Sequence, residues 1–163
     1  MKKGLLTLLF TLFGFLIGCE EYEKYSKTMG CLNRAYRIEY VSDDIGVDYW
    51  QTPEETKKRR KGDCEDKAFY LQDLLREKSI ESEVIFGFAD NRKRKTMHVW
   101  IEAKKGNITY VLDPSRRLMM SREKLNEHSY IPVYNDDYIK SQLKEFQERS
   151  GIKEINKHYE NLR

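Results

Sequence analysis

The chain has 163 residues, which is enough for one domain built around a single hydrophobic core. It carries 30 lysines and arginines against 27 aspartates and glutamates, and this near balance argues against a nucleic-acid-binding protein. Charged residues make up 35% of the chain, but 11 tyrosines and an aromatic content of 12% supply enough apolar surface for a folded core, which excludes a disordered protein.

The N-terminal segment has the layout of a secretory signal. Two lysines precede an apolar run over 5–17, which is shorter than the roughly 20 residues of a membrane-spanning helix. The run ends in LIGC, which resembles the lipobox of bacterial lipoproteins, where the cysteine is lipidated and becomes the first mature residue. We therefore predict a signal peptide over 1–18, lipidation of Cys19 and a polar, lipid-anchored tether over 19–30. An uncleaved anchor and an ordinary signal peptide are the alternatives.

A lipid anchor at this position places the protein in the cell envelope. Glu20 is not the aspartate that favours inner-membrane retention in Gram-negative lipoproteins, so in such a host we expect the outer membrane, facing the periplasm. In this oxidising compartment Cys31 and Cys64 can form one disulfide, or Cys64 can be a reactive thiol. No close pair of cysteines or histidines is available to start a zinc site.

Two helix starts mark the first half of the predicted domain, which covers 31–163. The segment over 31–50 suggests a short helix followed by a loop. Thr52 and Glu55 form a capping box around a proline at the first helical position, which predicts a helix. A second, central helix is predicted to start at Asp63 and to end near residue 78, since apolar residues recur there at helical spacing. These residues are Ala68, Phe69, Leu71, Leu74 and Leu75.

The periodicity then changes from helical to β. Three short β-rich runs cover 82–89, 96–103 and 108–113, and turn-forming segments separate them. A fourth run over 130–134 contains a proline and is predicted to be an edge strand. Apolar positions within 136–162 predict one or two covering helices. The expected architecture is α+β, with the central helix packed on an antiparallel sheet of three to four strands.

Three residues stand out by their positions in these elements. Cys64 opens the central helix, His98 lies within the second β run, and Asp113 ends the third. A helix N-terminus lowers the pKa of a thiol, an imidazole can hold its proton, and an aspartate can fix the tautomer of that imidazole. Cys64 could also be an inert core thiol. His128 and His158 are weaker candidates for the base because they fall in a predicted loop and an exposed helix.

These motifs resemble those of a known family. HVWIE and YVLDPS are similar to the His and Asp motifs of the transglutaminase-like superfamily, and DYWQTPEETKKRRKGDCEDKA is similar to the bacterial transglutaminase-like cysteine proteinases of the LapG type. The resemblance covers about residues 48–135. It departs from the family pattern at Lys67, where the family usually has an aromatic residue, and at the Asp113–Pro114 pair, where it often has Asp-Asn.

The resemblance implies a papain-like, transglutaminase-like core and a role for each motif residue. Cys64 would be the nucleophile, His98 the general base and acid, and Asp113 the residue that orients the imidazole. The oxyanion would be bound by the backbone N–H of Cys64 together with one side-chain donor. The candidates for this donor are Gln51, Trp50 and Tyr49.

Three carboxylates surround Cys64, although negative charge makes a thiolate harder to form. Asp63 can cap the helix, and Glu65 and Asp66 lie in its first turn, where acids interact favourably with the helix dipole. The resemblance offers a second explanation, since LapG-type proteases bind calcium through acids that match Asp63 and Glu65. No cofactor is required for the chemistry itself, so Ca²⁺ is the candidate ion at these two residues.

The expected function is that of an envelope lipoprotein with cysteine hydrolase activity on protein or peptide amides. The same acyl-enzyme could pass its acyl group to an amine, as in a transglutaminase, or deamidate glutamine. A non-catalytic binding lipoprotein that retains the fold is a third alternative. We expect a protein or peptide substrate, a membrane partner through the lipid anchor, no nucleic-acid partner and a monomeric state.

Overall fold

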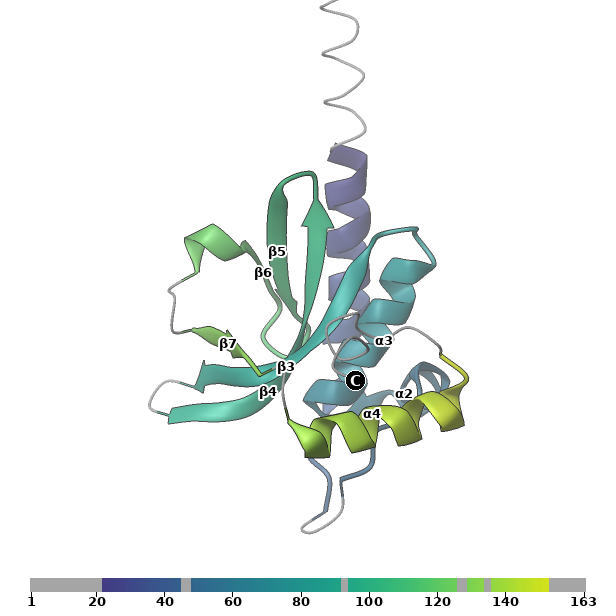
Figure 1. The fold of residues 1–163 in the computed structure, drawn as a ribbon. Coiled ribbons are helices and arrows are strands. Elements are labelled where there is room, and N and C mark those ends of the chain that lie inside the picture. The colour runs from purple at the N-terminus through teal and green to yellow at the C-terminus, as the bar shows by residue number, and fades with distance from the viewer. Residues whose placement is uncertain (1–21, 45–47, 92–93, 126–128, 134–135, 153–163) are drawn as a thin grey trace, which may run out of the picture.

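The computed structural model describes most of the predicted domain (Figure 1). The described residues are 22–44, 48–91, 94–125, 129–133 and 136–152. The predicted signal peptide, the lipidation site Cys19, and the histidines at 128 and 158 lie outside these ranges, so the predictions made for them stay predictions. Of the helices formed by the described residues, none has the length and apolar character needed to cross a membrane.

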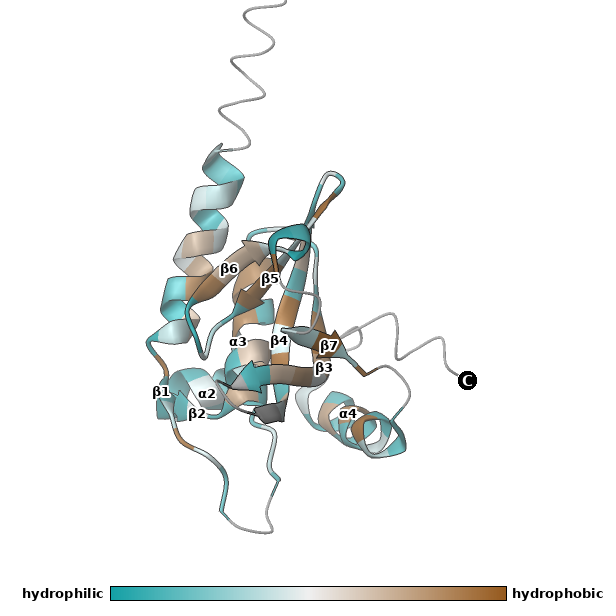
Figure 2. Cartoon of the chain, turned by 90° about the vertical axis from the view of Figure 1, so that its left-hand side faces the viewer, coloured by the Kyte–Doolittle hydropathy of each residue, from teal (hydrophilic) through white to brown (hydrophobic). Residues whose placement is uncertain are grey.

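A helix over 22–36 precedes the rest of the domain. The first part of this segment was predicted to belong to a tether, but Thr28, Cys31, Leu32 and Ala35 are all buried. Their spacing of three, four and seven residues puts them on one face of the helix. Figure 2 shows a hydrophilic outer end of this helix and a more apolar part beside β6. The second half of the segment therefore belongs to the folded body.

Helix α2 (Pro53–Arg59) has the predicted capping box. The backbone N–H of Glu55 donates to Thr52 Oγ1 at 3.3 Å, and the N–H of Thr52 donates to Glu55 Oε2 at 2.8 Å. The helix ends at Arg60, which has a left-handed φ of 57°. This turn redirects the chain toward the start of the central helix.

Helix α3 (Cys64–Arg76) is the predicted central helix. It is preceded by β2 (Lys61–Gly62), which pairs in parallel with β1 (Glu39–Tyr40). Its apolar face packs into the main core, where Phe69 stacks on Phe146 with ring centroids 4.1 Å apart. This packing fixes the position of the helix N-terminus, and with it the position of Cys64.

The central sheet has five antiparallel strands in the order β6-β5-β4-β3-β7. Their bounds are β3 Ser82–Asn91, β4 Arg94–Lys105, β5 Ile108–Asp113, β6 Leu118–Ser121 and β7 Tyr130–Pro132. The α+β architecture is confirmed, but the sheet has one strand more than the three to four predicted. Strand β6 was missed because its four residues, LMMS, show no alternation of apolar and polar side chains. A 3-10 turn, η1 (Arg122–Lys124), follows β6.

Helix α4 (Asp137–Ser150) is the predicted C-terminal covering helix. It buries Ile139, Leu143 and Phe146 at spacings of four and three residues, and it ends at Gly151, whose φ is 70°. Glycine tolerates this left-handed conformation and is common directly after a helix.

The two faces of the sheet belong to two apolar clusters. On the α3 face, alternate residues of β3 and β4, including Phe86 and Val99, join the main core. On the opposite face, Trp100 and Tyr130 pack edge-to-face, with 73° between their ring planes, in a second, smaller cluster. Because successive side chains of a strand point to opposite faces, a site that spans β4 can draw residues from both clusters.

Candidate active site

His98 and Asp113 form a hydrogen-bonded pair on neighbouring strands. The register pairs Ile101 of β4 with Leu112 of β5, so Asp113 lies one residue beyond this pair, in the direction of His98. His98 Nε2 lies 2.8 Å from Asp113 Oδ2, and both side chains are buried. With Nε2 engaged in this way, Nδ1 is the imidazole nitrogen left for proton transfer.

Four further groups bind the Asp113 carboxylate. Tyr130 Oη donates to Oδ2 at 2.7 Å, the backbone N–H groups of Ser115 and Arg116 donate to Oδ1 at 2.8 and 3.2 Å, and Arg116 Nε lies 3.4 Å from Oδ2. Burial raises the pKa of Asp113, but the hydrogen bond and charge of His98, with the Tyr130 hydroxyl, outweigh it and hold the pKa below its usual value. The carboxylate is therefore fixed in its charged form and in one orientation.

Tyr130 was missed as a site residue by the sequence analysis. The segment around it was predicted only as an edge strand, and nothing local connects its hydroxyl to an aspartate 17 residues earlier. Pairing of β7 with β3 brings it there: Tyr130 lies opposite Ala89 and stacks edge-on against Trp100. The contact depends on the sheet topology.

Cys64 is the first residue of α3, as predicted, and its thiol is hydrogen-bonded. Sγ donates to Glu65 Oε2 at 3.1 Å. Burial raises the pKa of the thiol well above its ordinary value, the carboxylates of Glu65 and Asp63 raise it further, and a backbone hydrogen bond from Val99 lowers it. That last contact places Cys64 beside the peptide that links His98 to Val99. The described residues contain no direct hydrogen bond between Cys64 and His98.

The carboxylates around Cys64 are strongly perturbed. Burial, together with the charges of Glu65 and Asp43, raises the pKa of Asp63 to about 8. Burial also raises the pKa of Glu65, against hydrogen bonds from Asp63 and Cys64. Asp63 occupies the N-cap position, yet its Oδ1 is buried without a hydrogen-bond partner. Capping alone thus leaves one buried carboxylate oxygen without a partner at the helix start.

Asp66 has a different role, because it anchors the segment before α2. It accepts hydrogen bonds from the backbone N–H of Gln51 at 2.6 Å, from Gln51 Nε2, and from the N–H of Asp63 at 3.3 Å. Burial and the charge of Asp63 raise the pKa of Asp66 to about 7, and the hydrogen bonds oppose this shift. Gln51 is therefore held against the first turn of α3.

The three candidate oxyanion donors differ in what their side chains already bind. Trp50 donates its one indole N–H to Asp48 at 2.9 Å, and the Tyr49 hydroxyl donates to Glu55 at 2.9 Å. Gln51 Nε2 carries two N–H groups, of which one is engaged with Asp66. Gln51 is thus the one candidate of the three with a donor to spare.

Lys67 lies one turn after Cys64, at the position where the resembling family usually has an aromatic residue. It is buried, and its ammonium donates to the carbonyls of Ile38 at 2.7 Å and Tyr36 at 3.2 Å. Tyr36 is the last residue of the helix over 22–36, so Lys67 places a positive charge at a helix C-terminus. Burial lowers the pKa of Lys67, and the charge of Asp113 opposes this shift. Lys67 therefore links α3 to the C-terminal end of the helix over 22–36.

Cys31 takes no part in the site. Its Sγ donates to the carbonyl of Leu74 at 3.5 Å, and both Cys31 and Cys64 are free thiols. Leu74 is ten residues along α3 from Cys64, about 15 Å at 1.5 Å per residue, whereas a disulfide requires Cα atoms within about 7 Å. The alternative of a Cys31–Cys64 disulfide is therefore inconsistent with the fold.

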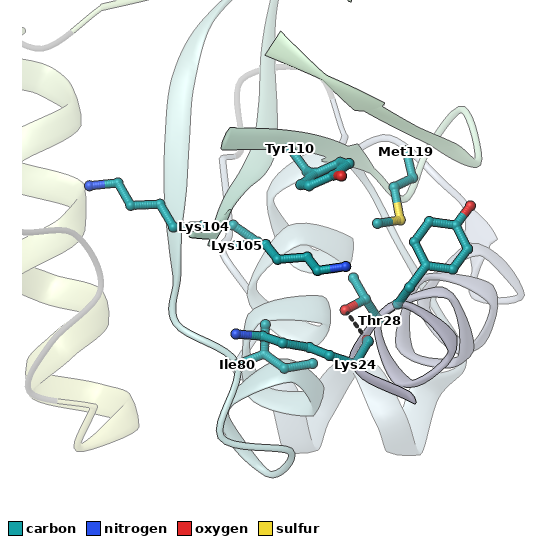
Figure 3. Close-up of a pocket in the computed structure, with 9 residues that line it drawn as sticks. Lys24, Thr28, Ile80, Lys104, Lys105, Tyr110 and Met119 are labelled. Atoms are coloured by element: carbon teal, nitrogen blue, oxygen red, sulfur yellow. Dashed lines mark hydrogen bonds between the residues drawn. The ribbon is translucent and has the colours of Figure 1, made fainter. Parts of the chain in front are cut away.

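A small cavity lies elsewhere in the domain, between the helix over 22–36 and strands β4 and β5 (Figure 3). Its volume is about 20 Å³, which suits a single water molecule. Lys105 extends toward Thr28 at this cavity, whereas Lys104 points away from it. The cavity shares no residue with the candidate active site.

Comparisons with known proteins agree with this fold. The family model of the transglutaminase-like superfamily matches residues 20–114. No curated protein matches the chain. The structure of Legionella pneumophila LapG aligns with a TM-score of 0.61 and 15% identity over 77% of each chain. Calcium-bound L. pneumophila LapG aligns with a TM-score of 0.56 and 19% identity, over 67% of this chain and 62% of that one.

A candidate cysteine protease from Cytophaga hutchinsonii also aligns, with a TM-score of 0.50 and 24% identity, over 60% of this chain and 35% of that one. The present chain therefore spans about a third of the Cytophaga protein and less than two thirds of the calcium-bound LapG structure. At these identities the likenesses establish the fold, and together with the family model they confirm the predicted transglutaminase-like core.

Proposed function

This chain belongs to the transglutaminase-like superfamily, and on that basis we propose that it is a cysteine hydrolase that cleaves amide bonds in proteins or peptides. The observation that carries the proposal is the 2.8 Å contact between His98 Nε2 and Asp113 Oδ2, on the strand whose next residue, Val99, forms a backbone hydrogen bond with Cys64 at the start of α3. An imidazole held by a buried carboxylate next to a helix-terminal thiol is the arrangement that amide hydrolysis by cysteine requires.

In the proposed reaction, His98 Nδ1 takes the thiol proton and Cys64 Sγ adds to the carbonyl carbon of the substrate. Asp113 holds the imidazolium that forms. His98 then gives its proton to the departing amine as the C–N bond breaks, leaving a thioester on Cys64. Water attacks the thioester, passes a proton through His98 to the sulfur and releases the acid. The backbone N–H of Cys64 and the spare N–H of Gln51 are the proposed donors to the oxyanion.

The carboxylates beside the thiol lead to a second part of the proposal, a calcium site at Asp63 and Glu65. Among the described residues, no group of three or more His, Cys, Asp or Glu side chains is arranged to hold a metal ion. Asp63 and Glu65 nevertheless fit a hard cation, because they are adjacent buried carboxylates and Asp63 Oδ1 has no partner. Water or backbone oxygens would complete the ligand set. When bound, Ca²⁺ would offset the negative charge that raises the pKa of Cys64.

Thermal unfolding with and without calcium tests this site independently of activity. Calcium is expected to stabilise the wild type by RT ln(1 + [L]/Kd), about 2.7 kcal/mol at a hundredfold excess over Kd. Glu65→Gln should lose this response, whereas Glu54→Gln, which changes an exposed acid in the first turn of α2, should keep it. A wild-type protein whose melting temperature is indifferent to calcium would refute the calcium site.

We place this activity at the cell envelope, through a lipid on Cys19. The support is the basic start, the short apolar run and the LIGC ending of the N-terminal segment. Lipidation supplies the several acyl chains that stable anchoring needs. Cys19→Ser should abolish detergent partitioning and change the mature mass, and an unchanged result for both would remove the anchor from the proposal.

Mass spectrometry tests the reaction itself. Candidate envelope proteins are incubated with the detergent-solubilised lipoprotein, with the Cys64→Ala variant as the control. A Cys64-dependent cleaved bond supports hydrolysis. A Cys64-dependent amine adduct or loss of ammonia would instead identify an acyl transferase or a glutamine deamidase. Equal cleavage by the wild type and by Cys64→Ala would show that Cys64 is not the nucleophile.

A further inference from the structure

Two apolar side chains, Phe88 and Met97, are exposed next to the candidate active site. They are directly opposite each other in the β3–β4 register and are 39% and 51% exposed. The residues two positions back along each strand, Phe86 and Val99, are buried in the main core. Since side chains alternate between the faces of a sheet, all four lie on the α3 face. The helix thus covers Phe86 and Val99 and leaves Phe88 and Met97 uncovered.

The Cys64 thiol lies near Val99, the buried neighbour of the exposed pair Phe88 and Met97. Cys64 packs against the main core, and a backbone hydrogen bond joins its sulfur to Val99. Met97 is two residues from Val99, about 7 Å at 3.3–3.4 Å per residue. Figure 1 shows the lower part of the β3–β4 hairpin extending past α3. A peptide whose carbonyl carbon reaches Cys64 Sγ can therefore place the side chain of a neighbouring residue near Phe88 and Met97.

The chemistry of the exposed pair determines which side chain it can receive. Phe88 and Met97 present apolar surface, against which an apolar substrate side chain would be buried. A carboxylate buried there would lose its hydration without gaining a hydrogen-bond partner from either side chain.

We propose that Phe88 and Met97 form a substrate subsite that receives an apolar side chain of a residue flanking the scissile amide. This subsite rests on the proposed hydrolase function, because it assigns a substrate class to the same site. The enzyme would therefore select leucine-like or aromatic residues over serine and would discriminate most strongly against glutamate.

Electrophilic dipeptide probes test the subsite on the detergent-solubilised protein. The probes are chloromethyl ketones in which one of the two residues is leucine, serine or glutamate, and the readout is the second-order rate of Cys64 alkylation by mass spectrometry. We expect the leucine probe to react at least about 10-fold faster than the serine probe, the range typical of an apolar substrate contact. Phe88→Ser and Met97→Ser should each reduce this ratio to about threefold or less.

The matched control is Ile108→Ser. Ile108 is a similarly exposed apolar residue, at 41%, but it lies at the start of β5, away from Cys64. Ile108→Ser should leave unchanged the ratio of the Cys64 alkylation rates measured with the leucine and serine probes. Melting temperatures of all three variants verify that each is folded.

The outcomes separate the subsite from the hydrolase. Alkylation of Cys64 at equal rates by all three probes, or a ratio that Phe88→Ser and Met97→Ser leave intact, overturns the subsite alone. If iodoacetamide labels Cys64 but none of the peptide probes does, the hydrolase proposal fails and the subsite fails with it.

Discussion

Replacement of Tyr130 by phenylalanine removes one hydroxyl from the Asp113 carboxylate and keeps the ring that packs on Trp100. The lost bond is short, at 2.7 Å, buried, and made to a charged group. Hydrogen bonds to charged groups contribute about 1.5–3 kcal/mol, so Tyr130→Phe should lower the free energy of unfolding at pH 7 by that amount. The variant should also reduce the rate of Cys64 alkylation by the leucine probe, because Asp113 orients His98 less firmly.

The pH dependence distinguishes this role from simple packing. Asp113 has a lowered pKa in the folded protein, so its ionised form stabilises the fold above the unfolded-state pKa, about 3.9, and this contribution is lost as the pH falls through the folded-state value. Without the Tyr130 hydroxyl the pKa of Asp113 in the folded protein rises, so its contribution to stability is smaller and is fully lost at a higher pH.

Urea unfolding at a series of pH values from 7 downward measures both effects, with Tyr110→Phe on β5 as the control tyrosine. The difference in the free energy of unfolding between wild type and Tyr130→Phe should be largest near pH 7. It should become smaller as Asp113 is protonated. A gap below about 0.5 kcal/mol at pH 7, or one that does not change with pH, would refute the assigned role of Tyr130.

Three further predictions follow from the packing and the site. Gly87→Ala should destabilise the protein strongly, because the added Cβ would lie 2.1 Å from the carbonyl oxygen of Ile131. Gly30→Ala, whose Cβ would have no atom within 4 Å, should leave the melting temperature unchanged or raised. Equal melting temperatures for the two variants would contradict this packing. Cys31→Ala should retain the wild-type rate of Cys64 alkylation, and a loss of labelling in a folded variant would mean that Cys31 contributes to the site. Asp113→Asn should reduce probe alkylation by orders of magnitude while iodoacetamide still labels Cys64, and a wild-type rate would exclude Asp113 as the orienting residue.

Local sequence signals determined the elements that depend on near neighbours. The capping box of Thr52 and Glu55 joins residues three apart, and the apolar spacing of α3 repeats within a single helix, so both were predictable from short stretches. Alternation likewise located β3, β4 and β5. The order of Cys64, His98 and Asp113 on a helix and two adjacent strands was visible for the same reason, because each lies at a fixed position within a recognisable element.

Tertiary structure decided which of these residues meet and what they bind. The Tyr130–Asp113 bond depends on β7 pairing with β3, which no short stretch of sequence encodes. Gln51 differs from its neighbours as an oxyanion donor because Asp66, 15 residues away, engages just one of its two N–H groups. Phe88 has the same apolar character as the buried Phe86, and its exposure follows from where α3 begins. Sequence patterns describe a residue and its near neighbours, whereas burial and hydrogen-bond partners depend on distant segments that only the packed chain brings together.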